Sequence, residues 1–315
     1  MRIEFGLPSE RPALAPPAAL SIGSFDGVHR GHRHVLACAA QATADEAGEV
    51  TLITFEPHPR CVVDPDNCPP SITTLDEKRE RLEAAKVDRL VVVPFTRELS
   101  ELAAAPFCER LCQAFALRHL VVGPDFALGY RRQGDVPFLR AFGAGHGFDV
   151  IVVPTVDDEQ GRISSSRIRA SLLSGEVEEA ATLLGYPYFL DARVEHGERV
   201  GRRIGYPTAN LAITPNKCLP ARGVYTTWSK VRGCWYPGAT NIGFRPTFGG
   251  DVMTVETYLL DFDDDIYREK IRTAFVHRLR DEIAYPDADA LTEQIGRDVE
   301  ETRALLGSAA PPEQL

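Results

Sequence analysis

Residues 22–32 read Ile-Gly-Ser-Phe-Asp-Gly-Val-His-Arg-Gly-His. The stretch lies where a first apolar strand, expected at Leu20–Phe25, gives way to a first helix. In an open α/β sheet, ligands bind at such a turn because the new helix offers free N–H groups and the positive end of its dipole to anions. The stretch therefore predicts an α/β domain with an anion site after its first strand.

Three glycines and two histidines give this turn its chemical character. Glycine lets the backbone approach a ligand closely, and imidazoles can donate hydrogen bonds to phosphate oxygens as charge develops on them. His29 and His32, three residues apart, are expected to project from the same face. A glycine-rich turn with solvated histidines is the alternative, but so complete a string favours phosphate binding. The glycines are Gly23, Gly27 and Gly31.

Further strand-like runs alternate with Ala-, Glu- and Arg-rich helical segments up to about residue 155. Nearly continuous hydrophobic strands separated by helices indicate a parallel sheet covered on both faces, which is a doubly wound α/β domain. Two short helices, Ser164–Leu173 and Glu176–Gly185, are expected to close this domain at residue 185. The four further runs are Val50–Phe55, Leu90–Phe95, His119–Phe126 and Phe148–Val153.

The residue pattern changes after Tyr188, where Gly, Pro and Asn recur at short intervals between strand-like runs. This pattern is typical of a small antiparallel barrel or sandwich, and we predict two domains, 1–185 and 186–315. A C-terminal helix over Asp289–Leu306 is expected to pack on the barrel. The strand-like runs are Gly223–Val231, Trp235–Ile242 and Val252–Leu260, and the helix places Leu291, Ile295, Thr302, Leu305 and Leu306 near one face.

Composition narrows the class of protein. The 315 residues include 35 Lys and Arg against 45 Asp and Glu, a formal net charge of −10, which argues against nucleic acid as a partner. No stretch approaches the ~20 apolar residues of a membrane span, and prolines interrupt the N-terminus where a signal peptide would be apolar. The 7 cysteines cannot all pair within one chain and none has Cys-x-x-Cys spacing. We therefore expect a soluble, cytoplasmic protein with no membrane partner.

A second glycine-rich stretch, 196–210, reads His-Gly-Glu-Arg-Val-Gly-Arg-Arg-Ile-Gly-Tyr-Pro-Thr-Ala-Asn. It is not a Walker A loop, because no Gly-Lys-Ser/Thr follows and a strand is expected next. Its spaced glycines allow backbone amides to surround phosphates. Thr208 and Asn210, two apart on an extended segment, point the same way and could meet one hard cation such as Mg²⁺. A structural loop bordered by glycines is the alternative.

These stretches resemble the family of bacterial bifunctional riboflavin kinase/FAD synthetases. Residues 23–32 resemble its nucleotidyltransferase signature, and residues 197–210 resemble its riboflavin kinase signature. The resemblance covers roughly residues 18–306. Other segments resemble the same family in the same order: Thr54–Pro59, Gly123–Phe126, Ile163–Arg169, Gly223–Tyr225, Asn241–Phe248 and Thr254–Phe262.

The resemblance implies two activities. The barrel would phosphorylate riboflavin with ATP to FMN, and the α/β domain would transfer AMP from a second ATP to FMN, giving FAD and pyrophosphate. Both steps would need Mg²⁺, which Thr208 and Asn210 would hold in the kinase. Glu256 would be the base that takes the proton from the attacking ribityl hydroxyl. In the adenylyl half the catalytic residues would be His29, His32 and Arg169.

The resemblance also implies the binding residues. ATP and its phosphates would be held by Gly23, Ser24, Phe25, Asp26, Gly27, Gly31, His58, Ser165, Ser166, Arg167, Gly197, Gly201, Arg202, Gly205 and Pro207. Flavin would be held by Asp125, Phe126, Asn241 and Arg245.

Departures from the family pattern leave two alternatives open. Ala127 and Leu128 stand where the family has a polar residue and an aromatic, in the loop that the resemblance places beside flavin. Arg268 stands where the family usually has glycine, and it could narrow the flavin end of the kinase site. The alternatives are a monofunctional riboflavin kinase with an impaired adenylyl half and a non-catalytic regulator that binds flavin nucleotides. The intact His29 and Glu256 favour the bifunctional enzyme.

Overall fold

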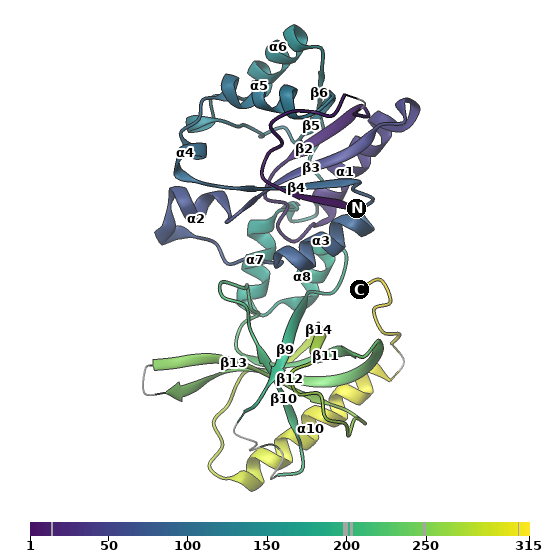
Figure 1. Ribbon diagram of the computed structural model, residues 1–315. Helices are drawn as coiled ribbons and strands as arrows, with labels where there is room; N and C mark the ends of the chain where they lie inside the picture. Colours follow the sequence, from purple (N-terminus) through teal and green to yellow (C-terminus); the bar gives the residue numbers. More distant parts are fainter. Residues whose placement is uncertain (14, 198–200, 202–203, 248–249, 308) are drawn as a thin grey trace. The chain divides into compact units, whose positions relative to one another are not determined.

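The computed structural model describes residues 1–315 apart from 14, 198–200, 202–203, 248–249 and 308. The chain forms two compact units, Met1–Ser165 and Ser166–Leu315 (Figure 1). Helices α7 (Ser165–Ser174) and α8 (Val177–Leu184) are the two short helices expected from the sequence. The predicted domain boundary at residue 185 stays a prediction, because compactness alone does not show which segment folds independently.

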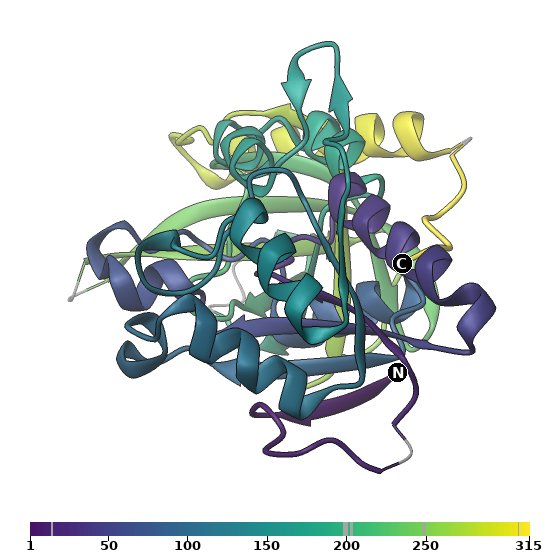
Figure 2. The ribbon, with the colours of Figure 1, turned by 90° about the horizontal axis from the view of Figure 1, so that it is seen from above.

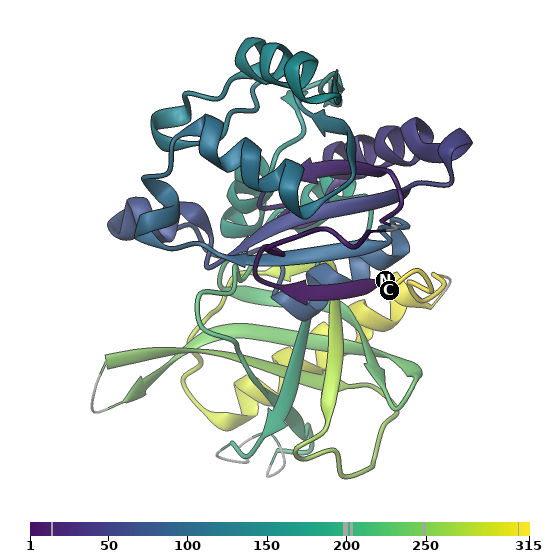
Figure 3. The same ribbon diagram turned by 45° about the horizontal axis from the view of Figure 1, so that its top comes forward.

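The first unit is built on a sheet of parallel strands in the order β1-β4-β3-β2-β5-β6 (Figure 3). All five strands predicted for this domain are present. The strand β1 was not predicted, because four residues with only one apolar pair carry little periodicity. The strands are β1 (Arg2–Phe5), β2 (Ala18–Ile22), β3 (Glu49–Glu56), β4 (Arg89–Pro94), β5 (Leu117–Val122) and β6 (Asp149–Val152).

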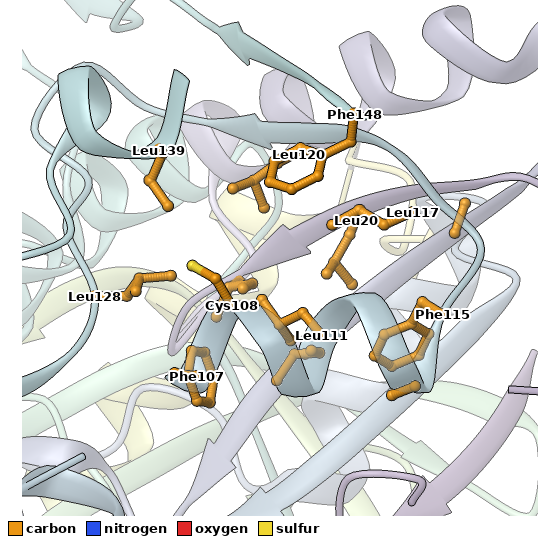
Figure 4. Packing of buried hydrophobic residues seen from close by; sticks show 14 of the residues in the cluster. Leu20, Phe107, Cys108, Leu111, Phe115, Leu117, Leu120, Leu128, Leu139 and Phe148 are labelled. Carbon is orange, nitrogen blue, oxygen red and sulfur yellow. The ribbon is translucent and has the colours of Figure 1, made fainter. Parts of the chain in front are cut away.

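Side chains of the sheet alternate between two apolar clusters, one on each face. Leu20 of β2 packs with Leu111 of α5 (Ala104–Ala114) and Leu139 of α6 (Val136–His146), as Figure 4 shows. The next residue back, Ala19, joins the opposite cluster with α1 (Arg30–Thr43) and α3 (Leu75–Ala84). The predicted covering of both faces is confirmed.

The strand order reverses at β2, which has β3 on one side and β5 on the other. Such a switch point is where open α/β sheets bind ligands, because loops diverge there from the carboxyl ends of the strands. The loops after β2 and β5 hold the first glycine-rich stretch and the Gly123–Phe126 segment. The Thr54–Pro59 segment runs from the end of β3 to the first residue of α2. The short elements of these and neighbouring loops are η1 (Ala44–Glu46), α2 (Pro59–Val63), η2 (Pro65–Asn67), α4 (Arg97–Ser100) and η3 (Tyr130–Arg132).

Two further features of the first unit were not predicted. Cys61 and Cys68 form a disulfide with their Cα atoms 4.3 Å apart, although the sequence offered no pairing signal. A small hairpin, β7 (Asp157–Asp158) and β8 (Gly161–Arg162), precedes α7 and is visible as a pair of short teal arrows in Figure 2.

The second unit is a closed antiparallel barrel with the strand order β10-β13-β12-β11-β14-β9, so the barrel prediction holds and the sandwich does not. The predicted runs correspond to β11, β12 and β13, whereas β9 and β14 were not predicted. The strands are β9 (Phe189–Glu195), β10 (Thr208–Ala212), β11 (Gly223–Val231), β12 (Cys234–Thr247), β13 (Gly250–Leu259) and β14 (Lys270–Arg280).

The C-terminal helix α10 (Ala288–Leu306) packs on the barrel as predicted. The hydroxyls of Thr302 and Thr226 on β11 are 3.3 Å apart, and Leu306 is buried. Leu305 is 42% exposed, so its place on the packed face was wrong. Leu306, four residues after Thr302, lies on the packed face as predicted.

Candidate functional sites

The loop after β2 has an unusual backbone. Phe25, Gly27 and Val28 all have positive φ, at 44°, 81° and 35°. Only glycine adopts this region freely, and a β-branched residue there is rare. Phe25 and Val28 are both buried, so core packing holds the strained turn in place.

The structure brings the two histidines of this loop into contact. Their ring centroids are 3.6 Å apart with planes 18° from parallel, and the His32 ring also stacks on Phe25 at 4.5 Å. His29 caps α1, because its Nδ1 accepts a hydrogen bond from the backbone N–H of His32 at 3.3 Å. A Cβ at Gly31 would lie 3.1 Å from the His29 ring, so only glycine leaves that ring undisturbed.

Asp26 fastens this loop to the segment that precedes α3. Its buried carboxylate accepts hydrogen bonds from the backbone N–H groups of Ile72 (2.9 Å) and Thr73 (3.0 Å) and from the Thr73 hydroxyl (3.1 Å). The N–H of Gly27 donates in turn to the same hydroxyl at 3.1 Å. A direct contact between Asp26 and ATP stays a prediction.

Sequence reasoning missed polar groups beside this loop. The Thr54 hydroxyl donates to the carbonyl of Ser24 at 3.1 Å and lies 3.5 Å from the ammonium of Lys78 on α3. Lys78 is buried, although α3 has the charged composition of a solvated helix. The burial of that cation depends on tertiary packing, which residue type alone does not signal.

The predicted phosphate-binding residues of other loops lie as follows. His58 caps α2, and its Nδ1 accepts from the N–H of Arg60 at 3.2 Å. The Ser165 hydroxyl at the start of α7 donates to the carbonyl of Asp26 at 2.9 Å, which joins two of the motifs. Further along α7, Ser166 is exposed, Arg169 is half-buried, and Arg167 forms an ion pair with Glu179 at 3.0 Å. The approach of these three to phosphates stays a prediction.

The loop after β5 contains Ala127 and Leu128, the two residues that depart from the family pattern. Leu128 is buried in the apolar cluster beside α5, and its backbone exchanges hydrogen bonds with Gly134. Phe126 packs against the same cluster. The carboxylate of Asp125 pairs with Arg162 of β8, and its carbonyl accepts from Arg132 at 2.6 Å.

In the barrel, two glycines of residues 197–205 stand where a side chain would collide, and a third has a positive φ. A Cβ at Gly197 would lie 2.3 Å from the amide nitrogen of Asn210, and one at Gly201 would lie 2.2 Å from the carbonyl of Tyr206. Gly205 has a φ of +87°, which suits glycine. Arg202 lies outside the described residues.

Four polar residues of three neighbouring strands meet at one place. The Thr208 hydroxyl on β10 donates to Oε2 of Glu256 on β13 at 3.1 Å. Glu256 is paired with Asn210 of β10 on one side and with Asn241 of β12 on the other. The structure thus brings the predicted base and the predicted metal ligands together. Arg245 also belongs to β12, but its side chain is outside the described part of the chain.

Two hollows in the barrel share Thr208. We call the one lined by Gly197, Pro207 and Asn210 the Gly197 hollow. We call the one lined by Glu256 and Asn241 the Glu256 hollow; it has a volume of about 500 Å³. Two hollows that share a lining residue suit a reaction between two substrates. The Gly197 hollow is also lined by Asp263, Asp264, Asp265 and Tyr267, and the Glu256 hollow by Tyr206, Tyr258, Arg280, Tyr285 and Asp298.

A partly buried ion pair that the sequence did not reveal forms one wall of the Glu256 hollow. Arg280 of β14 donates from Nε (2.9 Å) and Nη2 (2.7 Å) to the carboxylate of Asp298 on α10. Burial alone would lower the pKa of Arg280, but Asp298 outweighs it and the pKa is raised. Burial, followed by the proximity of Tyr206, raises the pKa of Tyr258 in the same hollow.

The residues of the barrel site fit a magnesium ion held jointly with phosphates. No group of three His, Cys, Asp or Glu side chains that could hold a metal occurs among the described residues. Thr208 and Asn210 offer a hydroxyl and an amide oxygen, which are hard ligands. Mg²⁺ usually takes one or two protein ligands and completes its shell with water and substrate phosphate, so this sparse set is suitable.

Arg268 is not among the residues that line the Glu256 hollow, and the expectation that it narrows the flavin end stays a prediction. It lines a different hollow with Arg193 and His196. Its φ of 67° lies in the left-handed region, which explains why glycine suits this position.

No helix in the described part of the chain combines the length and apolar character needed to cross a bilayer.

Comparison with known proteins gives matches to both units. Residues 12–167 match the family model described as FAD synthetase, and residues 184–306 match the one described as riboflavin kinase. A bifunctional riboflavin kinase/FMN adenylyltransferase of Pseudomonas fluorescens is 35% identical over 98% of this chain and 99% of its own length. The Escherichia coli (strain K12) protein of the same name is 34% identical over 99% and 100%.

One solved structure aligns with almost the whole chain. A crystal structure described as a macrolide-efflux protein from Streptococcus pneumoniae has a TM-score of 0.88 at 30% identity, covering 96% of this chain and 99% of that one.

Proposed function

This chain belongs to the bifunctional riboflavin kinase/FMN adenylyltransferase family, and from that premise we propose which residues carry out each reaction. The protein phosphorylates riboflavin with ATP to give FMN, and it transfers AMP from ATP to FMN to give FAD and pyrophosphate. Residues 12–167 match the FAD synthetase model and residues 184–306 match the riboflavin kinase model. The impaired and the non-catalytic alternatives are therefore not favoured.

For the kinase, we propose that riboflavin occupies the Glu256 hollow and that ATP occupies the Gly197 hollow. The ribityl hydroxyl oxygen attacks the γ-phosphorus, its proton passes to the carboxylate of Glu256, and ADP leaves. The observation that carries this assignment is the shared position of Thr208, which lies in both hollows and donates to Glu256. Asn241 and Arg245 on β12 are assigned to the flavin side.

Thr208 and Asn210 are assigned as the ligands that hold Mg²⁺ in the kinase. When bound, Mg²⁺ neutralises phosphate charge and so eases the attack of the hydroxyl. Gly197 keeps the Asn210 side chain in place, because any larger residue would overlap it. Arg202, Gly201, Gly205 and Pro207 are assigned to the phosphates.

For the adenylyltransferase, we assign ATP to the loops after β2 and β3. A phosphate oxygen of FMN attacks the α-phosphorus in line, and pyrophosphate leaves without any protein nucleophile. His29 and His32 donate hydrogen bonds to the phosphates as charge builds up. Their stacked rings and the fixed backbone of this loop support these roles. Ser165, Ser166, Arg167 and Arg169 are assigned to the leaving pyrophosphate, and Asp125 and Phe126 to FMN.

We also assign only small molecules as partners: riboflavin, FMN and ATP. The net charge of −10 supports the absence of a nucleic acid partner. The cytoplasm is the assigned compartment, since both reactions consume ATP.

A chromatographic time course tests the proposal. Riboflavin, ATP and Mg²⁺ are added to the purified protein, and we expect FMN to rise and then give way to FAD. Removal of Mg²⁺ with a chelator should stop both steps. Accumulation of FMN without FAD would contradict the adenylyl assignment, and absence of any product would contradict both.

A further inference from the structure

The disulfide between Cys61 and Cys68 closes a short loop in the first unit. The loop contains most of α2 and all of η2, elements of five and three residues. Helices this short are not stable alone, because nucleation costs more than so few hydrogen bonds return. Within the loop, the amide of Asn67 donates to the carboxylate of Asp64 at 2.9 Å. The bridge is therefore a main constraint on the shape of this segment.

Both ends of the bridged segment are fixed to the adenylyl site. On the N-terminal side, His58 caps α2, and the N–H of Cys61 donates to the carbonyl of His58 at 2.8 Å. On the C-terminal side, Ile72 and Thr73 donate to the carboxylate of Asp26. Along the chain, the bridge thus lies between His58 and the segment that holds Asp26, and we assign both His58 and Asp26 to ATP. A change in the bridged loop is therefore expected to alter the positions of both residues.

The bridge is also accessible from solvent. Both cysteines are half-buried, and Val63 between them is 56% exposed. Burial raises the pKa of Cys108 to about 12 and also raises that of Cys112. Since the thiolate is the reactive form, these two thiols of the unit are disfavoured in exchange.

We propose that Cys61 and Cys68 form a reversible thiol–disulfide site that sets the affinity of the adenylyltransferase for ATP. In the forward step, a thiolate of the pair attacks a low-molecular-weight disulfide and forms a mixed disulfide, releasing one small thiol. The second cysteine then attacks the mixed disulfide, which closes the Cys61–Cys68 bridge and releases the second small thiol. Two cysteine thiols are oxidised to one disulfide, and one small disulfide is reduced to two thiols. A dithiol reverses the step. The closed form has the higher affinity, because the open loop gains conformational freedom that ATP binding must remove.

The inference rests on the proposed assignment of His58 and Asp26 to the adenylyl site. Its test therefore measures both reactions on the same protein. Protein equilibrated with oxidised glutathione and protein reduced with dithiothreitol are compared for the KM of ATP in FAD formation from FMN and in FMN formation from riboflavin. Alkylation and mass measurement of the 61–68 peptide record the state of the bridge. Cys61→Ser and Cys68→Ser remove the bridge, and Cys234→Ser in the barrel is the matched control.

We expect reduction to raise the KM for ATP in FAD formation about fivefold and to leave FMN formation unchanged. Cys61→Ser and Cys68→Ser should resemble the reduced protein in either buffer, and Cys234→Ser should respond like the unmodified chain. Equal KM values in the two states, an equal change in both reactions, or a 61–68 peptide that stays reduced in oxidised glutathione would overturn the proposal. Loss of FAD formation in every state would overturn the adenylyl assignment itself, and the inference with it.

Discussion

The hydroxyl of Thr208 donates a hydrogen bond to the carboxylate of Glu256 across 3.1 Å, from β10 to the neighbouring β13. Thr208 lines both the Gly197 hollow and the Glu256 hollow, and Glu256 lines the second of them. With Glu256 as the proposed base and Thr208 as a proposed metal ligand, this contact would put proton removal and phosphate binding at one point, as a direct phosphoryl transfer requires.

Replacing the proposed base tests this arrangement. Glu256→Gln keeps the shape of the side chain but cannot accept the proton, so kcat for FMN formation should fall by about 10²–10⁴. FAD formation from FMN should not change. The matched control is Glu195→Gln. Glu195 is an exposed glutamate of β9 that lies opposite Asn210 in the register of β9 and β10. A Glu256→Gln protein with full kinase activity would refute the base assignment.

Gly197→Ala tests whether the absence of a side chain at Gly197 holds the Asn210 side chain in place. The new Cβ would lie 2.3 Å from the amide nitrogen of Asn210, so that side chain must move. We expect the kinase rate at fixed Mg²⁺ to fall at least about tenfold, or ~1.4 kcal/mol in barrier, with partial recovery at higher Mg²⁺. Gly145→Ala is the control, because Gly145, like Gly197, does not have a positive φ and a Cβ there would meet no atom within 4 Å. Equal kinase rates in both variants would contradict the proposed role of Gly197 in positioning Asn210.

Asp26→Asn tests the anchor of the first loop. The amide cannot accept all the hydrogen bonds that Ile72 and Thr73 donate, which should cost about 1–3 kcal/mol of stability. FAD formation should fall while FMN formation persists. Activity assays of both steps and thermal unfolding measure this, with the exposed Asp45→Asn as the control. An unchanged unfolding temperature would show that the anchor is not needed.

Asp298→Asn tests the wall of the Glu256 hollow. It removes the charge partner of Arg280 and loosens α10 against β14. We expect the KM for riboflavin to rise about tenfold, equivalent to ~1.4 kcal/mol, while kcat changes little. Glu293→Gln changes an exposed glutamate on the same helix and should have no effect. A loss confined to kcat would show that the pair acts on the chemical step instead.

The Asp191–Arg272 pair predicts a pH dependence of stability. Burial alone would raise the pKa of Asp191, but Arg272 and then Lys270 outweigh it, so the pKa is lowered. A lowered folded pKa gives stability that is present above the unfolded value of about 3.9 and is lost as pH falls through the folded pKa. Unfolding by denaturant should show a steeper loss below about pH 4 for the wild type than for Asp191→Asn. Parallel curves would contradict this.

The sequence determined the two architectures and the two glycine-rich stretches. Local signals were enough there, because buried parallel strands are continuously apolar and β11 is bounded by Gly and Pro. His29 and His32 were expected on one face from their spacing, and the fixed geometry of a helix start delivers that. The edge strand β1 was missed, since its four residues have little apolar periodicity.

Tertiary structure alone decided which distant groups meet. The contact of Thr208 with Glu256 depends on the register of β10 and β13, residues 48 positions apart, and no local pattern encodes a register. The burial of Lys78 and the Arg280–Asp298 pair likewise arise from packing against elements far along the chain. From residue type alone, a charged side chain is predicted to face solvent. Its burial can be predicted only when the element that covers it is known.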